Sequence, residues 1–233
     1  MDFQGRTVVI TGGTGGLGTA VVAALLAAGA ACHIPYVVEA EAQAFRHRDH
    51  ARVKLYPRID LTNEDAVDRF YRQVPDLWAS IHLAGGFAAG GIATAGKSVL
   101  AGQFEVNVVT CYLCCRAGVL AMAANPAGGR IVNVAARPAL EWRGGAGMAA
   151  YTASKAAVAA LTVALAEEVA KDAILVNAVA PSILDTPANR NAMPQADHAA
   201  WPKVEEVAQT ILFLASPANA VTRGAVVPVY GRA

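Results

Sequence analysis

Residues 7–18 read TVVITGGTGGLG and join a β-branched run to a glycine-rich turn. The run Thr7 to Thr11 is typical of a buried parallel strand. Thr19 to Ala28 is rich in Ala, Leu and Val, has the length of a helix and ends before Gly29. A glycine-rich turn between a strand and a helix suits a dinucleotide, because bare backbone approaches a pyrophosphate closely and the helix N-terminus offers free N–H groups. We therefore predict a dinucleotide site at residues 12–18 rather than a flexible turn.

The rest of the chain continues this alternation of strands and helices. Short apolar runs predict further strands at 30–38, 53–56, 79–84, 130–134, 174–180 and 225–229. Longer periodic stretches predict helices at 39–48, 63–73, 98–124, 149–171 and 204–214. The segment 141–147 is expected to be an irregular loop, and about 182–203 a substrate lid. The pattern predicts a single-domain Rossmann fold over residues 1–233, an α/β doubly wound parallel sheet of seven strands with helices on both faces.

Composition narrows the class of protein. Hydrophobic residues make up 55% of the 233 residues and charged residues 16%, which supports a large core. The net charge of +1 gives no electrostatic reason to expect nucleic acid or an anionic membrane as a partner. The N-terminus is polar, and the longest apolar run, 20–34, is shorter than a bilayer span. We expect a cytoplasmic protein with a small-molecule substrate.

Three of the four cysteines are clustered. Cys111 and Cys114 have the spacing of a redox motif, but they lie in an apolar helical run, which favours buried or interface thiols. No histidine or second cysteine pair completes a zinc site in the sequence, so no metal is expected. Free thiols, Cys32 included, fit a reducing compartment.

Tyr151 and Lys155 lie four residues apart in a predicted helix, which places both side chains on one face. An ammonium near a phenol favours the phenolate, so Lys155 is expected to lower the pKa of Tyr151. The pair would then exchange a proton near neutral pH. The same spacing also occurs by chance on amphipathic helices. The catalytic interpretation is favoured here because the chain also contains the glycine-rich turn.

The spacing Thr11-Gly12-x-x-x-Gly16-x-Gly18, followed by Tyr-x-x-x-Lys, resembles the short-chain dehydrogenase/reductase family. Four motifs recur in order, and the resemblance covers essentially the whole chain. It implies an NAD(P)(H)-dependent oxidoreductase that forms a homodimer or homotetramer. It also implies that Lys155 binds the nicotinamide ribose, that Tyr151 donates a proton and that Asn107 holds a water in a proton relay. The cofactor-binding residues that it implies are Gly12, Thr14, Gly15, Gly16, Leu17, Gly18, Asp60, Leu61, Ala84, Gly85, Gly86, Tyr151, Lys155, Pro181, Ile183 and Thr186.

Some positions have alternative interpretations or depart from the family pattern. Asp60 would contact the adenine ring or cap the helix that follows it. Tyr36 stands where NAD-preferring members often carry an acid, so Glu39 is the nearby candidate for the ribose hydroxyls, and the preference leans to NADH. His82 replaces a family Asn and is expected to be structural. The catalytic Ser after the fifth strand is absent, because the chain reads Ala135-Ala136-Arg137-Pro138.

The segment 135–151 and the segments 184–190 and 193–197 resemble the dihydropteridine reductases of the family, which also lack that Ser. A quinonoid ring is strongly electrophilic and needs less polarisation than a ketone. We therefore expect a reductase of a quinonoid dihydropterin-like substrate. The alternatives are a carbonyl reductase or alcohol dehydrogenase, with Arg137 or a backbone N–H replacing the Ser, and a non-catalytic NAD(P)-binding regulator.

Overall fold

Seven parallel strands form one sheet in the order β3-β2-β1-β4-β5-β6-β7. The computed structural model describes residues 1–123 and 125–233. The order reverses between β1 and β4, which places a topological switch point at the carboxyl ends of these two strands. The strands are β1 Thr7–Thr11, β2 Ala31–Tyr36, β3 Val53–Pro57, β4 Leu77–His82, β5 Gly129–Val134, β6 Ile174–Pro181 and β7 Val226–Val229.

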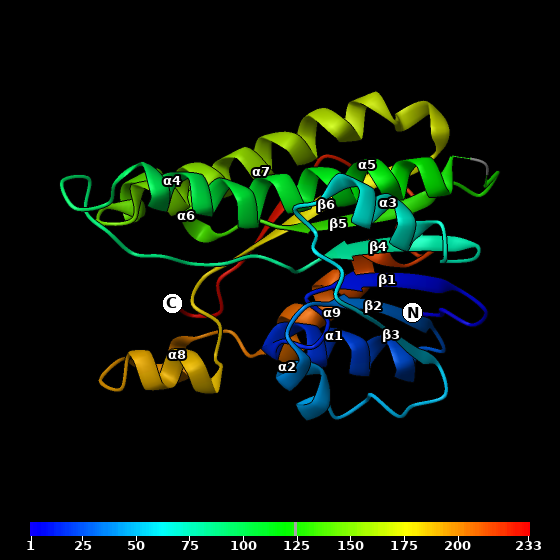
Figure 1. Cartoon of the computed structure of the whole chain (residues 1–233), viewed down its shortest axis with the longest axis horizontal. Helices are drawn as coiled ribbons and strands as arrows, with labels where there is room; N and C mark the ends of the chain where they lie inside the picture. The colour runs from blue at the N-terminus through cyan, green and yellow to red at the C-terminus, as the bar shows by residue number, and fades with distance from the viewer. Residues whose placement is uncertain (124) are drawn as a thin grey trace.

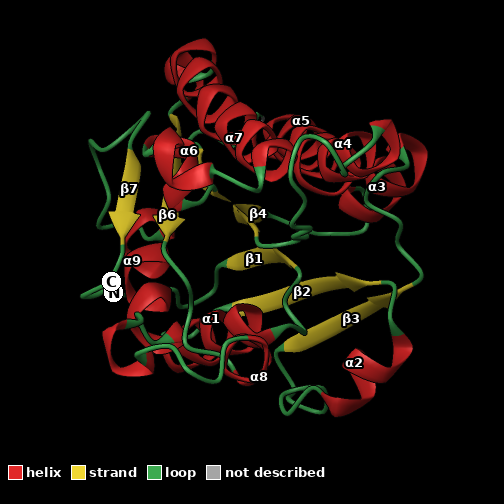
Figure 2. Cartoon of the chain, turned by 90° about the vertical axis from the view of Figure 1, so that its left-hand side faces the viewer, coloured by secondary structure: helices red, strands yellow, loops and turns green. Residues whose placement is uncertain are grey.

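Helices cover both faces of the sheet, so β1 and β4 are buried along their whole length (Figures 1 and 2). One layer contains α1 and α9, which pack on each other, and the other contains α3, α4, α5 and α7. Each layer closes its own hydrophobic core against the sheet. The helices are α1 Gly16–Ala27, α2 Glu39–Ala44, α3 Glu64–Tyr71, α4 Lys97–Phe104, α5 Thr110–Met122, α6 Arg137–Leu140, α7 Ala149–Glu168, α8 Pro187–Ala192 and α9 Val204–Ala215. The predicted doubly wound Rossmann fold is confirmed.

The long helix predicted over 98–124 is interrupted by one π-helical turn, Glu105–Val109, between α4 and α5. Such a turn shifts the helical register by one residue and is frequent at functional sites. The predicted end of the helix, Ala124, lies outside the described residues. The sequence pattern did not indicate this turn, because α4, the π-helical turn and α5 follow one another without a break and all remain helical.

Other predicted segments also differ from the structure. The helix predicted over 39–48 stops at Ala44, because Phe45 turns to an extended conformation and buries its ring in the core. The helix predicted over 149–171 ends at Glu168 and is followed by a 3₁₀ turn, Ala170–Asp172. The loop predicted over 141–147 contains the 3₁₀ turn Trp142–Gly145, directly after α6. The expected lid likewise contains a helix, α8, which stands apart from the other helices in Figure 1.

Two helical stretches, Lys97–Met122 and Ala149–Glu168, are long and apolar enough to cross a membrane by length and composition. Both belong to the layer that packs on the sheet. Core helices of soluble proteins pass the same test, so these two stretches give only weak support for a membrane span.

Candidate active site

The glycine turn lies at the carboxyl end of β1, where it leads into α1. Gly15 is the N-cap and has no side chain with which to cap the helix, so the first N–H groups of α1 remain available to an anion. A Cβ on Gly15 would lie 3.4 Å from the carbonyl oxygen of Gly12, an ordinary contact. The turn therefore presents bare backbone at a positive helix end, and these residues fit a pyrophosphate.

The tight packing of the turn explains two of its glycines. Gly12 has φ +65°, and a Cβ there would lie 2.8 Å from the backbone nitrogen of Ala84. A Cβ on Gly18 would lie 2.2 Å from the carbonyl oxygen of Gly12. Thr11 adds a direct link between the two strand ends, because its hydroxyl accepts a hydrogen bond from the Ala84 N–H at 3.2 Å. The turn and the end of β4 thus form one rigid corner at the switch point.

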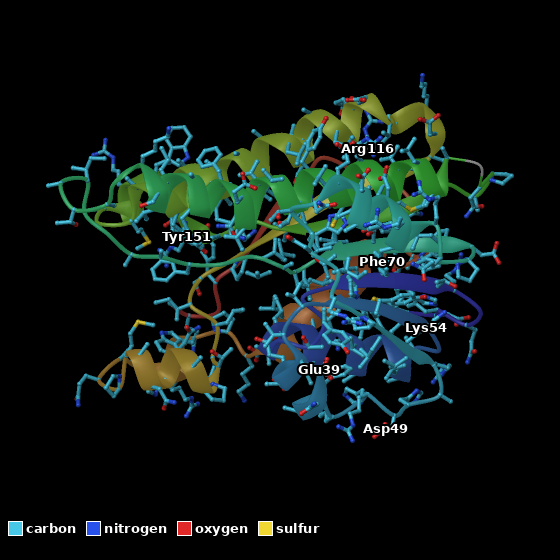
Figure 3. All side chains as sticks on the ribbon, in the orientation of Figure 1. Glu39, Asp49, Lys54, Phe70, Arg116 and Tyr151 are labelled. Carbon is cyan, nitrogen blue, oxygen red and sulfur yellow. The ribbon has the colours of Figure 1, made fainter. Side chains whose placement is uncertain are left out.

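Tyr151 and Lys155 both lie in the first half of α7. The ring of Phe87 meets the ring of Tyr151 edge-on, with the centroids 4.9 Å apart. Lys155 is only 7% exposed, and its ammonium donates a hydrogen bond to the carbonyl oxygen of Val134 at 2.9 Å. Figure 3 shows Tyr151 on the helical layer that contains α4, α5 and α7.

Asn107 lies in the π-helical turn and is held on three sides. Its amide donates to the carbonyl oxygen of Gly86 at 2.9 Å and to the Ser154 hydroxyl at 3.1 Å, and its Oδ1 accepts from the Gly86 N–H at 3.0 Å. A Cβ on Gly85 would lie 2.7 Å from the Asn107 Oδ1 and 3.3 Å from the Lys155 Nζ. The structure therefore brings Asn107 and Lys155 together beside the glycines that follow β4.

Burial sets the protonation of the pair. Burial raises the pKa of Tyr151 to about 12, so the expectation that Lys155 lowers that pKa is wrong for the protein without cofactor. The Lys155 ammonium instead bonds to Val134. Burial lowers the pKa of Lys155 to about 8, although the charge of Cys111 opposes this shift. At neutral pH Tyr151 is therefore a protonated phenol, the form that donates a proton, beside a lysine that releases a proton more easily than usual.

The lowered pKa of Lys155 gives stability a defined pH dependence. Between about pH 8 and the ordinary lysine pKa of 10.5, the unfolded chain binds a proton that the folded chain has lost, so the cost of burying the ammonium is relieved as pH rises. We expect the unfolding free energy of the wild type, minus that of Lys155→Met, to increase by roughly 1 kcal/mol per pH unit between about pH 8 and 10. Urea denaturation across this range measures the difference. A flat or falling difference would show that the pKa of Lys155 is not lowered in the folded protein.

Asp60 and Leu61 were predicted to bind the cofactor, and Asp60 had helix capping as its alternative role. Asp60 does not cap α3, because Asn63 caps that helix by accepting from the Ala66 N–H at 2.9 Å. The Asp60 carboxylate instead accepts from the backbone and hydroxyl of Thr62 and fixes the turn after β3. Leu61 is buried in the core.

Thr186 lies next to the glycine turn, since a Cβ on Gly16 would be 3.5 Å from its methyl group. Its hydroxyl caps α8 by accepting from the Asn189 N–H at 3.2 Å. Pro181 ends β6 and is buried, whereas Ile183 is exposed on the way to α8. The predicted set around 181–186 therefore lies at the same edge of the sheet as the turn.

Two carboxylates lie at the carboxyl end of β2. The Thr14 hydroxyl donates to Glu41 at 3.3 Å, which joins the glycine turn to α2, and the Tyr36 hydroxyl donates to Glu39 at 3.1 Å. Burial and then Glu39 raise the pKa of Tyr36, while Arg58 lowers it less. The local charge here is thus dominated by carboxylates. Sequence reasoning named Glu39 but missed Glu41, whose position depends on where the short helix α2 begins.

Among the described residues, the four that directly follow β5, from Ala135 to Pro138, carry no hydroxyl in the place of the absent Ser. Ala135 packs in a small cluster with Ala139, Ala159 and Ala180, and Ala136, the next residue, is buried but outside that cluster. Arg137 does not supply the missing donor in this conformation, because its guanidinium binds Glu141 at 2.7 Å and the carbonyl oxygen of Ala233 at 2.9 Å. Ser154 and Phe87, which contact Asn107 and Tyr151, were not recognised in the sequence; the position of Ser154, three residues after Tyr151, was the available signal.

Comparison with known proteins identifies the family of the chain. A family model described as short chain dehydrogenase matches residues 6–197. The chain is 32% identical to the (2S)-[(R)-hydroxy(phenyl)methyl]succinyl-CoA dehydrogenase subunit of Thauera aromatica, over 99% of this chain and 97% of that protein. It is 34% identical to the cis-4-hydroxycyclohexanecarboxylate dehydrogenase of Sinomonas cyclohexanicum, over 98% and 96%. A short-chain dehydrogenase/reductase from Serratia marcescens has a similar structure, with a TM-score of 0.88, 28% identity and 100% coverage of both chains.

A Rossmann sheet with a glycine turn at its switch point and a Tyr-x-x-x-Lys helix beside it defines a class of NAD(P)-dependent oxidoreductases. The chain belongs to the short-chain dehydrogenase family. The predicted family and enzyme class are therefore confirmed.

Proposed function

We propose that this oxidoreductase interconverts a secondary alcohol and its ketone, with Tyr151 as the proton donor and acceptor. The observation that carries the proposal is the convergence of Tyr151, Lys155 and Asn107 at the carboxyl edge of the sheet. Their bonds to Val134 and Gly86 position the lysine and the amide before any substrate arrives. The two relatives described above both have names that specify a hydroxylated substrate, which supports the proposal that this chain acts on an alcohol.

Each of the chain's own groups has a role in this reaction. The turn from Gly12 to Gly18 and the start of α1 would hold the pyrophosphate, and Lys155 would bind the nicotinamide ribose. The bound nicotinamide supplies or accepts the hydride. Tyr151 gives its proton to the developing alkoxide, and Lys155 returns a proton to Tyr151 through a water that Asn107 holds. In this account residues 182–203, including α8, cover the substrate.

We further propose a preference for NADH. A 2′-phosphate would bring additional negative charge close to Glu41 and Glu39, and like charges repel at such distances. We expect NADH to bind at least about tenfold more tightly than NADPH, and Glu41→Gln to narrow that ratio. Fluorescence titration of the wild type and the variant with both cofactors measures it. Glu168→Gln, the same charge change at the C-terminal end of α7, is the matched control and should leave the ratio unchanged. Tighter binding of NADPH by the wild type would refute the preference and direct attention to Arg58.

A second candidate substrate is a quinonoid dihydropterin, and one observation favours it. Ala135 and Ala136 offer no hydroxyl where the family places its Ser, and a quinonoid ring needs less polarisation than a ketone. The relatives described above are dehydrogenases of other compounds, so this candidate rests on the missing hydroxyl and on the resemblance of the segments around it.

Restoring the hydroxyl separates the two candidates. Ala136 is the first residue after β5 whose side chain lies outside the alanine cluster, so we expect Ala136→Ser to place a donor near the substrate carbonyl. An added oxyanion donor should raise kcat/KM for a ketone by about tenfold or more, since removing such a donor typically costs ~10²–10³. Turnover of quinonoid dihydropterin should change little. Steady-state assays with both substrates test this, and an unchanged or lower rate with ketones would contradict the proposed role of this position.

We also propose a homodimer or homotetramer in a reducing, cytoplasmic compartment. All four cysteines are free and buried, which agrees with reducing conditions. The layer formed by α4, α5 and α7 exposes large apolar side chains that a second copy of the chain would cover. These are Leu100, Phe104, Tyr112, Leu120 and Val163.

A further inference from the structure

Three metal-binding side chains converge in the interior between α5 and the sheet. They are His82 at the end of β4 and Cys111 and Cys115 on α5, and the imidazole nitrogen and the two sulfurs all lie within 4.8 Å of one another. The three residues are at most 5% exposed. The reaction proposed above uses none of them.

Helix geometry explains why the sequence suggested the pair Cys111 and Cys114 instead. Cys111 and Cys114 have redox spacing, but residues four apart share a helix face, so Cys115 is the partner that points the same way as Cys111. That face lies against β4, where His82 completes the group. Cys114 is equally buried, yet its sulfur is not one of the converging atoms among the residues that the structure describes.

The distances are close to those of a metal site. The Cys115 Sγ lies 3.6 Å from the His82 Nδ1. Metal–thiolate bonds of about 2.3 Å and metal–imidazole bonds of about 2.0–2.1 Å, at the roughly 120° angle of a site with three ligands, separate the two donor atoms by about 3.8 Å. The Cys111 Sγ lies within 4.8 Å of both other donor atoms, so it would have to move closer to complete the coordination shell.

The surroundings also resemble the second shell of a metal-binding histidine. Such a histidine donates its other ring N–H to a fixed acceptor, which sets the tautomer. The Nε2 of His82 lies 2.8 Å from the Ser80 hydroxyl, and that hydroxyl lies 2.7 Å from the Tyr71 hydroxyl. Ser80 can therefore accept from Nε2–H and donate to Tyr71, which leaves Nδ1 free as a ligand.

Asn133 lies on the other side of the imidazole. Its amide donates to Thr162 at 2.9 Å, so its Oδ1 faces the His82 Nδ1 at 2.8 Å and accepts a hydrogen bond from it when no ion is bound. The same oxygen lies 3.5 Å from the Cys115 sulfur. The group is thus satisfied without metal and able to exchange one hydrogen bond for a coordinate bond.

We propose that His82, Cys111 and Cys115 form a buried binding site for one Cu(I) ion. Thiolates are soft donors that suit Cu(I), and imidazole is also a copper ligand. Three ligands in a dry site suit this ion better than ions that need four ligands or bound water. Within the described residues no fourth His, Cys, Asp or Glu joins the group. Binding releases the two thiol protons to solvent, moves the His82 proton to Nε2 and leaves the oxidation state of copper unchanged.

The test is an anaerobic competition between the reduced full-length protein and a chromogenic Cu(I) chelator. We expect the wild type to retain roughly one Cu(I) per chain, and Cys111→Ser, Cys115→Ser and His82→Asn each to weaken binding by roughly 100-fold or more. Circular dichroism and Tm identify any variant that fails to fold. The Cu(I) affinities of the remaining variants then test the site. The assay needs no turnover, so its result is independent of the proposed reaction.

Cys114→Ser and Cys32→Ser are the matched controls, because both remove a buried thiol outside the group. Both should bind Cu(I) as the wild type does. The proposal is overturned if the wild type yields its copper to the chelator completely, or if Cys114→Ser loses as much affinity as Cys115→Ser. Either result would show that His82 and the two cysteines are only a hydrogen-bonded part of the core.

Discussion

Replacing Tyr151 by Phe should lower kcat by about 10²–10⁴ and leave cofactor affinity within about twofold of the wild type. The variant loses only the hydroxyl that exchanges the proton, while its ring keeps the edge-on contact with Phe87. The neighbouring bond from Lys155 to Val134 does not involve the phenol and should persist. Steady-state kinetics and a separate cofactor titration measure the two effects.

Tyr112→Phe is the matched control for that experiment. It removes the same atom from an exposed tyrosine of α5, in the same helical layer. Its turnover should equal that of the wild type. A Tyr151→Phe enzyme that keeps more than about a tenth of wild-type kcat would show that another group donates the proton.

Gly18→Ala should damage both stability and cofactor binding. Its Cβ would lie 2.2 Å from the Gly12 carbonyl oxygen and 2.6 Å from the Gly13 Cα, and backbone atoms cannot move aside as a flexible side chain does. We expect the free energy of unfolding to fall by about 3 kcal/mol. For a chain of this size, that loss lowers Tm by roughly 6–12 °C. Opening the turn should also weaken NADH binding by roughly 100-fold, because the pyrophosphate depends on its exact backbone positions. Thermal unfolding and cofactor titration measure these effects.

Gly15→Ala separates steric damage to the fold from damage to the cofactor site. Gly15 has φ −75° and ψ −178°, which any residue adopts, and its added Cβ meets only the Gly12 oxygen at 3.4 Å. We expect Tm to stay within a few degrees of the wild type. Equal losses of Tm in the two variants would mean that the turn is not the tightly packed corner that the structure describes.

The fold followed from the sequence because its signals are local. The glycine turn, the strand before it and the helix after it lie within two dozen residues, and alternation of strands and helices then selects a parallel sheet. The Tyr151–Lys155 pair was equally accessible, since helical spacing alone puts both on one face.

Features that depend on tertiary contacts were not predictable. The π-helical turn at 105–109 continues the apolar composition around it. Glu41 reaches Thr14 only because α2 begins at Glu39, three residues after the end of β2. The raised pKa of Tyr151 depends on how deeply α7 packs, which spacing does not report. The meeting of His82 with Cys115 joins residues 33 positions apart.

The most direct test of the proposed reaction is hydride transfer itself. Purified wild-type protein is mixed with NAD⁺ and a panel of cyclic secondary alcohols, and the appearance of reduced-nicotinamide absorbance is followed; quinonoid dihydropterin with NADH is run in parallel. We expect turnover of at least one cyclic alcohol that disappears in Tyr151→Phe. Tight cofactor binding without turnover of any alcohol or of the pterin, or turnover that survives in Tyr151→Phe, would contradict this expectation.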